Sequence, residues 1–356
     1  MSPCNSTDQA AVIAWLARDV ARSASSPVTA KLLREVPAAN PTALLPSVWV
    51  LAIPKVQEGA DFQYALAGLN FVGQARPSAT LNPVNHRPIV KVVLFLGLSA
   101  LTVVGYLFLL NVLNGKVGPF SAAVPATFLA LAAFALNWRF FKVEGRSLAE
   151  VGFDRPFLRF RQMAIGFVAG ALTVGAWIVA LRSITPVSWQ VASAIHASGA
   201  VASFAFIVFN NLAEELVYRS YLFLLLMRSY GTTLAIISTS VLFTLLHIQA
   251  GVPWPNALAG VLTSALLYAA LFVRWRSVPL VLAFHAGMNV MQEAVGLRTS
   301  GLTIFVPEYA VKATFSQSTA VLVLAAAINL SLAAAVLFFA RSSAARARRA
   351  TGSGAG

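Results

Sequence analysis

Charged side chains are scarce in this chain. Only 11% of its 356 residues are Asp, Glu, Lys or Arg, whereas 58% are hydrophobic. Soluble domains carry about 25% charged residues. The composition therefore excludes an ordinary soluble domain and predicts an all-α, polytopic membrane protein.

Cysteines and acidic residues are also few. The single cysteine, Cys4, excludes an internal disulfide and a Cys-based metal site. With 26 basic and 12 acidic residues, the formal net charge is +14. The basic residues flank apolar runs instead of forming a basic domain, which is typical of the positive-inside pattern of membrane proteins. We therefore predict no nucleic-acid partner.

Apolar segments between residues 88 and 340 are long enough to cross a bilayer. We predict eight spans, at about residues 88–112, 120–138, 163–181, 201–227, 232–248, 257–273, 278–295 and 318–340. Lys and Arg gather in the loops on one side, which predicts that both termini are cytoplasmic. We expect a multi-pass protein of the cell membrane in contact with lipid. The Ala-rich, Arg-over-Lys composition indicates a bacterial inner membrane.

The sequence divides into three parts by composition. Residues 1–85 are rich in Pro, Ala and Ser, and we interpret them as an N-terminal cytoplasmic extension that is partly helical or disordered. Residues 86–340 form the predicted transmembrane domain. Residues 341–356 are basic and end in small polar residues, which predicts a disordered cytoplasmic tail.

An unusual group of ionisable residues interrupts the apolar segment 201–227. Each such group costs roughly 2.5–3.5 kcal/mol in a membrane helix, so it marks a functional site by default. Glu215 and Arg219 are four residues apart and share a helical face, so they can neutralise each other. Glu214 is rotated by about 100° from Glu215, towards Asn210 and Tyr218. It is therefore the better candidate for a general base.

Two further apolar segments each carry a histidine. His247 lies four residues after Phe243, and His285 lies four residues before Asn289. Glu214, the two imidazoles and the amide could hold a water for attack on a carbonyl, with N–H groups stabilising the oxyanion. Alternatively, Glu214, His247 and His285 could ligate zinc and leave a position open for water. Spacing alone leaves both mechanisms open.

Glu293 continues the His285–Asn289 face by one further turn. It stands close to the end of its predicted span. We interpret it as a surface acid that snorkels to the membrane interface.

Three motifs in order resemble those of one family. Glu214–Arg219 matches EExxxR, Phe243–His247 matches FxxxH, and His285–Asn289 matches HxxxN. Together they resemble the CPBP intramembrane proteases, which include the type 2 CAAX prenyl endopeptidases. The resemblance covers residues 201–295.

The resemblance implies an eight-helix membrane fold with a polar cavity open to the cytoplasm. It implies that Glu214 activates water while His247, His285 and Asn289 position it and stabilise the oxyanion. Glu215 and Arg219 would be the supporting pair. We favour a metal-free glutamate mechanism, with zinc as the alternative.

These observations predict an intramembrane endopeptidase that hydrolyses a peptide bond near the cytoplasmic membrane surface. Its substrate would be a peptide or a membrane-anchored protein, and a prenylated CaaX peptide is the family's best-known substrate. One alternative is a non-catalytic scaffold or immunity protein of the same fold. Another is a proton-coupled transporter, although the chain lacks two inverted halves with matched broken helices.

Overall fold

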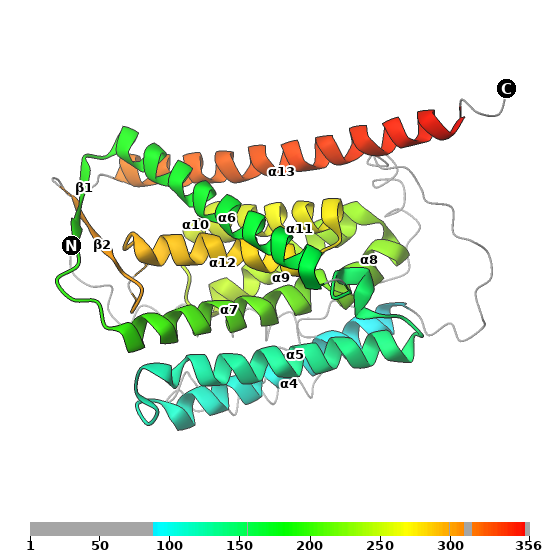
Figure 1. Ribbon diagram of the computed structural model, residues 1–356, viewed down its shortest axis with the longest axis horizontal. Coiled ribbons are helices and arrows are strands. Elements are labelled where there is room, and N and C mark those ends of the chain that lie inside the picture. Colours follow the sequence, from blue (N-terminus) through cyan, green and yellow to red (C-terminus); the bar gives the residue numbers. More distant parts are fainter. Residues whose placement is uncertain (1–87, 155, 299, 310–314, 353–356) are drawn as a thin grey trace, which may run out of the picture. The chain divides into compact units, whose positions relative to one another are not determined.

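The computed structural model describes residues 88–154, 156–298, 300–309 and 315–352. The predicted N-terminal extension, residues 1–85, lies outside them. The described residues all fall within one compact unit, Pro77–Gly356. They form a bundle of helices with one two-stranded sheet (Figure 1), which confirms the predicted all-α class.

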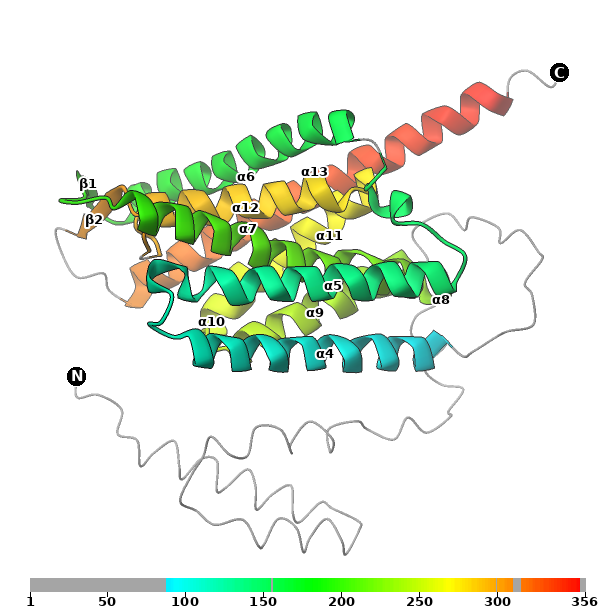
Figure 2. The same ribbon diagram turned by 60° about the horizontal axis from the view of Figure 1, so that its bottom comes forward.

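Long helices run back and forth along this bundle, as Figures 1 and 2 show. The helices of ten or more residues in the described part of the chain are α4 (Pro88–Leu113), α5 (Ala123–Val143), α6 (Pro156–Ile184), α7 (Ala197–Arg219), α8 (Tyr221–Tyr230), α9 (Thr232–Gln249), α11 (Thr263–Trp275), α12 (Val278–Ala294) and α13 (Phe315–Gly352). The shorter turns are η3 (Gly118–Ser121), η4 (Leu148–Val151), α10 (Trp254–Asn256) and the π-helical η5 (Ala257–Leu262).

The protein is a multi-pass membrane protein. Within the described residues, seven helical stretches are long and apolar enough to cross a membrane: 88–113, 118–143, 160–184, 197–230, 232–249, 254–275 and 318–339. The predicted span 278–295 corresponds to α12, which has 17 residues and whose first eleven residues are all buried. On α4, by contrast, Leu101 and Phe108 are each 65% exposed, on a surface that lipid tails can cover. Which end faces the cytoplasm stays a prediction.

The last helix, α13, is longer than the predicted span 318–340. It continues to Gly352 and so covers most of the segment 341–356, for which the sequence predicts disorder. That segment is rich in Ala and Arg, which are among the strongest helix formers. Helical propensity accounts for the difference.

A small sheet closes one end of the bundle. Strand β1 (Val187–Val191) pairs antiparallel with β2 (Phe305–Tyr309), with Trp189 opposite Pro307. The Trp189 indole N–H also donates a hydrogen bond to the carbonyl of Val295, at 3.0 Å. The sheet therefore fixes the C-terminal end of α12.

Helices α6 and α12 pack closely because glycines line their interface. Gly166 and Gly170 on α6 face the backbone of α12 at Leu280 and Phe284, and Gly287 on α12 faces the backbone at Phe167. Small residues at such spacing let two membrane helices approach closely. This contact sets the depth and rotation of α12, which carries His285 and Asn289 directly beyond Phe284.

Replacing Gly170 with Ala tests this contact. The new Cβ would collide with the Phe284 backbone, which cannot move without shifting α12. We expect Gly170→Ala to destabilise the protein by about 1–3 kcal/mol, the usual range for overpacking. The matched control is Gly175→Ala on the same helix, where nothing lies within 4 Å of the added Cβ. Thermal unfolding in detergent that gave equal stabilities for the two variants would contradict the packing argument.

An ionic network joins the loop after α5 to neighbouring helices. Glu144 accepts hydrogen bonds from Lys91 of α4 and from Arg146, which also binds Glu150 at 2.9 Å. Arg228 of α8 reaches the other oxygen of Glu150. Burial opposes ionisation of Glu144, but these donors outweigh it and lower its pKa, and the hydrogen bond from Arg146 lowers that of Glu150. The network therefore ties α8 to the rest of the bundle.

Candidate active site

Helix α7 ends directly after Arg219, so the predicted span 201–227 is interrupted. Ser220 leaves the helical region (φ −109°, ψ −115°), and α8 begins at Tyr221. The backbone N–H of Tyr221 donates to the side-chain oxygen of the fully buried Asn137 on α5, at 3.1 Å. A partner on another helix thus replaces one hydrogen bond that the break removes.

Glu215 and Arg219 form a completely buried pair. The Arg219 Nε lies 3.5 Å from Glu215 Oε2, and both side chains are 0% exposed. The guanidinium also donates to the carbonyl of Ala265 at 3.3 Å and lies over the rings of Phe243 and Tyr268, at 4.8 and 5.5 Å from their centroids. Carboxylate, carbonyl and aromatic faces together compensate the buried cation.

Glu214 occupies a different environment from its neighbour. Its side chain is 21% exposed, so it is the carboxylate of the pair that solvent or a substrate can reach. Asn210 donates to Oε1 at 2.9 Å, as their four-residue spacing predicts. The other oxygen, Oε2, lies 3.9 Å from His285 Nε2. Glu214 is therefore held at one oxygen and faces an imidazole with the other.

His285 bridges the two glutamates. Its Nδ1 lies 2.9 Å from Glu215 Oε1, while Nε2 is directed at Glu214. The ring stacks on Tyr268, with centroids 4.5 Å apart and a tilt of 30°. Glu215 thus binds an imidazole as well as Arg219. The sequence predicted only the arginine, because His285 lies 70 residues further along the chain.

Asn289 lies one turn beyond His285 and contacts α7. Its Nδ2 donates to Asn211 Oδ1 at 3.1 Å, and Asn211 is only 1% exposed. We did not predict Asn211 from the sequence. The available signal was its position four residues before Glu215, on the same face of α7.

His247 packs against the aromatic ring of Phe243. Its Nδ1 is 2.9 Å from the carbonyl of Phe243, one turn earlier on α9. The Phe243 ring lies 4.3 Å from the His247 ring and 6.3 Å from the His285 ring. Across the described residues, no hydrogen bond or ion pair joins His247 to Glu214. Glu214, Glu215, Arg219 and His285 thus form one polar cluster, and His247 adjoins it through Phe243.

These positions do not fit a three-ligand zinc site. The part of the chain that the structure describes contains no group of three His, Cys, Asp or Glu side chains placed to hold a metal ion. The predicted ligand set of Glu214, His247 and His285 is therefore not assembled, and a metalloprotease assignment finds no support in the geometry.

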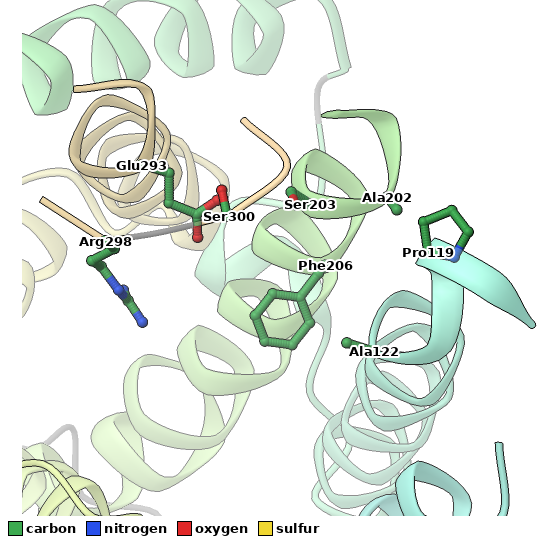
Figure 3. A pocket seen from close by; sticks show the side chains of 8 residues that line it. All are labelled: Pro119, Ala122, Ala202, Ser203, Phe206, Glu293, Arg298 and Ser300. Carbon is green, nitrogen blue, oxygen red and sulfur yellow. The ribbon is translucent and has the colours of Figure 1, made fainter. Parts of the chain in front are cut away.

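Glu293 is not a surface acid, so that prediction is wrong. It is only 7% exposed and lines a pocket beside Arg298 and Ser300 (Figure 3). The chain after α12 folds back, and Ile304 N donates to Ala294 O at 2.9 Å. This return covers the end of α12 and buries a side chain that would otherwise reach the surface.

Comparison with known families bears on the segment that holds this cluster. Residues 195–291 match the family described as type II CAAX prenyl endopeptidase Rce1-like. The matched segment contains all three motifs, and the match confirms the predicted resemblance. Searches of curated proteins and of solved structures gave no significant match.

Proposed function

We propose that the protein is an intramembrane endopeptidase whose general base is Glu214. The premise is that residues 195–291 match the type II CAAX prenyl endopeptidase Rce1-like family. One observation carries this assignment. Two adjacent carboxylates have opposite environments, because Glu215 is fully buried against Arg219 and His285 whereas Glu214 is accessible and faces an imidazole nitrogen. Of these two carboxylates, Glu214 is the one that combines access to water with an oxygen, Oε2, that makes no hydrogen bond within the described residues.

Glu215 also orients His285. Its Oε1 lies 2.9 Å from His285 Nδ1, and the other ring nitrogen, Nε2, lies 3.9 Å from Glu214 Oε2. A carboxylate that holds one ring nitrogen fixes the orientation of the imidazole, so Glu215 keeps Nε2 directed at the reacting groups.

The reaction follows from this arrangement. Glu214 removes a proton from water as the water oxygen attacks the carbonyl carbon of the peptide bond, and the C=O electron pair moves onto oxygen. His285 Nε2–H stabilises this oxyanion, assisted by the amide of Asn289 and by His247. The oxyanion then collapses, the C–N bond breaks, and the protonated Glu214 gives its proton to the departing amine. One water is consumed, and one carboxylic acid and one amine are formed.

The family match supports a peptide or protein substrate. Because the cluster lies among membrane-spanning helices, we propose a membrane-anchored chain cut near the cytoplasmic surface, with a prenyl group as one form of anchor. We place the protein in the cell membrane, with both termini in the cytoplasm.

Hydrolysis in labelled water tests the proposal. Purified protein in lipid nanodiscs is incubated with a library of palmitoyl- and farnesyl-anchored peptides in H₂¹⁸O, and the products are identified by mass spectrometry. We expect cleavage at a peptide bond with one ¹⁸O atom in the new carboxylate. Cleavage that a chelator abolishes and zinc restores would overturn the metal-free mechanism. No cleavage of any library member would count against the hydrolase and favour the non-catalytic scaffold.

A further inference from the structure

A polar stripe extends from the cluster along two helices. Asn210 lies between Phe206 and Glu214 on α7, at four-residue spacing, and Asn289 lies between His285 and Glu293 on α12 in the same way. Residues spaced by four share one helical face. The Asn289–Asn211 hydrogen bond joins α12 to the neighbouring face of α7, the one that carries Glu215. The stripe leads away from Glu214 towards the end of α12.

A pocket of about 270 Å³ lies at the far end of the stripe (Figure 3). Its apolar wall comes from η3 and the first turns of α7, and includes Ala202 and Phe206. Its polar wall comes from the end of α12 and the following loop, and includes Glu293, Arg298 and Ser300.

Glu293 presents an incompletely paired carboxylate to this pocket. The residue is only 7% exposed, and Ser300 interacts with its side chain, but among the described residues Oε2 lacks a well-formed hydrogen bond. Figure 3 shows the carboxylate directed towards Ser300, away from the α12 backbone. A buried carboxylate oxygen that is not fully satisfied costs free energy, so the pocket favours a ligand that donates a hydrogen bond to Oε2.

Arg298 supplies the complementary donor. It is exposed, and its Nη1 lies 3.5 Å from Asn289 Oδ1, so the guanidinium stands between the pocket and the catalytic cluster. The pocket therefore offers one acceptor, one donor and an apolar wall. An extended peptide unit presents the complementary set: one N–H, one C=O and an adjacent side chain.

The distances fit a bound peptide. Eight residues separate Phe206 from Glu214 and His285 from Glu293, which is about 12 Å at the helical rise of 1.5 Å per residue. An extended chain covers about 3.3 Å per residue. A peptide whose scissile bond lies at Glu214 therefore reaches the pocket with the unit three to four residues away.

We propose that this pocket is a substrate-binding subsite that holds one peptide unit of the substrate, three to four residues from the scissile bond. Glu293 Oε2 accepts the N–H of that unit, and Arg298 donates to its carbonyl oxygen. The apolar wall at Ala202 and Phe206 takes the neighbouring side chain. This inference rests on the proposed peptidase function and assigns two specificity-determining residues to it.

Binding measured without turnover tests the subsite separately from catalysis. The protein carries Glu214→Gln, and the probe is a fluorescent N-palmitoyl oligoalanine peptide in nanodiscs. Each amide is replaced in turn by an ester, which removes one N–H donor. We expect one position at which the ester weakens binding by roughly tenfold or more, the effect of losing a hydrogen bond to a carboxylate. That penalty should disappear when Glu293→Met is added.

Variants outside the pocket provide the controls. Glu308→Gln on β2 and Arg182→Gln near the end of α6 change exposed residues and should leave the ester penalty intact. Arg298→Gln should weaken every peptide that is long enough to reach the pocket, and leave shorter peptides unaffected. An ester penalty that survives Glu293→Met, or is absent at every position, would overturn the subsite, as would failure of the longest peptide to bind. None of these results depends on whether the protein with Glu214 intact cleaves peptides.

Discussion

Glu214→Gln is expected to lower kcat by about 10²- to 10⁴-fold, the usual contribution of a general base. Glutamine keeps the size of the side chain and an oxygen that can accept the hydrogen bond from Asn210. It cannot take a proton from water. KM and thermal stability should therefore change little. Single-turnover cleavage of a substrate found in the labelled-water experiment measures the effect, since it isolates chemistry from product release.

The control for this substitution is Glu308→Gln, which removes an exposed carboxylate on β2. It should leave kcat unchanged. If Glu214→Gln retained the wild-type rate, the base would lie elsewhere and the accessible carboxylate would lose its proposed role. A loss of rate accompanied by a loss of folded protein would point to a structural role instead.

The asymmetry between the two glutamates could be predicted from the sequence because it depends on local geometry. In a helix, a four-residue spacing pairs Glu215 with Arg219 and turns Glu214 towards Asn210, and the structure has both contacts. The all-α class and the apolar spans could be predicted for a similar reason. Length and composition alone decide whether a helix can cross a bilayer.

Contacts between distant segments could not be predicted. The Glu215–His285 and Asn211–Asn289 bonds join residues 70 and 78 positions apart, and they depend on how closely α6 packs against α12. The break at Ser220 has no local cause such as proline or glycine. It is stabilised from α5 by Asn137.

The burial of Glu293 at the end of α12 could not be predicted for a related reason. Glu293 lies near the end of an apolar segment, where an acid is usually exposed. The return of the chain through Ile304 and the pairing of β1 with β2 cover it. Because strands this short leave little signal in a sequence, the sheet and the pocket beside it could be found only in the structure.

Removing the buried cation is expected to have the largest effect on stability. Arg219→Gln removes the cation from the fully buried Glu215, which keeps its contact with His285. Breaking a buried ion pair by removing one partner typically costs about 3–5 kcal/mol, because the other charge stays buried without compensation. Denaturant unfolding in detergent micelles measures the loss. Arg228→Gln is the matched control, since its ion pair with Glu150 is half exposed and should contribute at most about 1 kcal/mol.

The double variant Arg219→Gln/Glu215→Gln separates charge from packing. If the loss in Arg219→Gln comes from an uncompensated carboxylate, neutralising Glu215 as well should restore most of the stability, since neutral groups of similar shape cost far less to bury. If the double variant is no more stable than Arg219→Gln, the contacts of the guanidinium with Phe243, Tyr268 and the Ala265 carbonyl carry the stability instead. In the first case the double variant should still cleave poorly, because the Glu215 carboxylate would no longer orient His285. A stable double variant with normal activity would contradict that orienting role and leave Glu215 with a purely structural one.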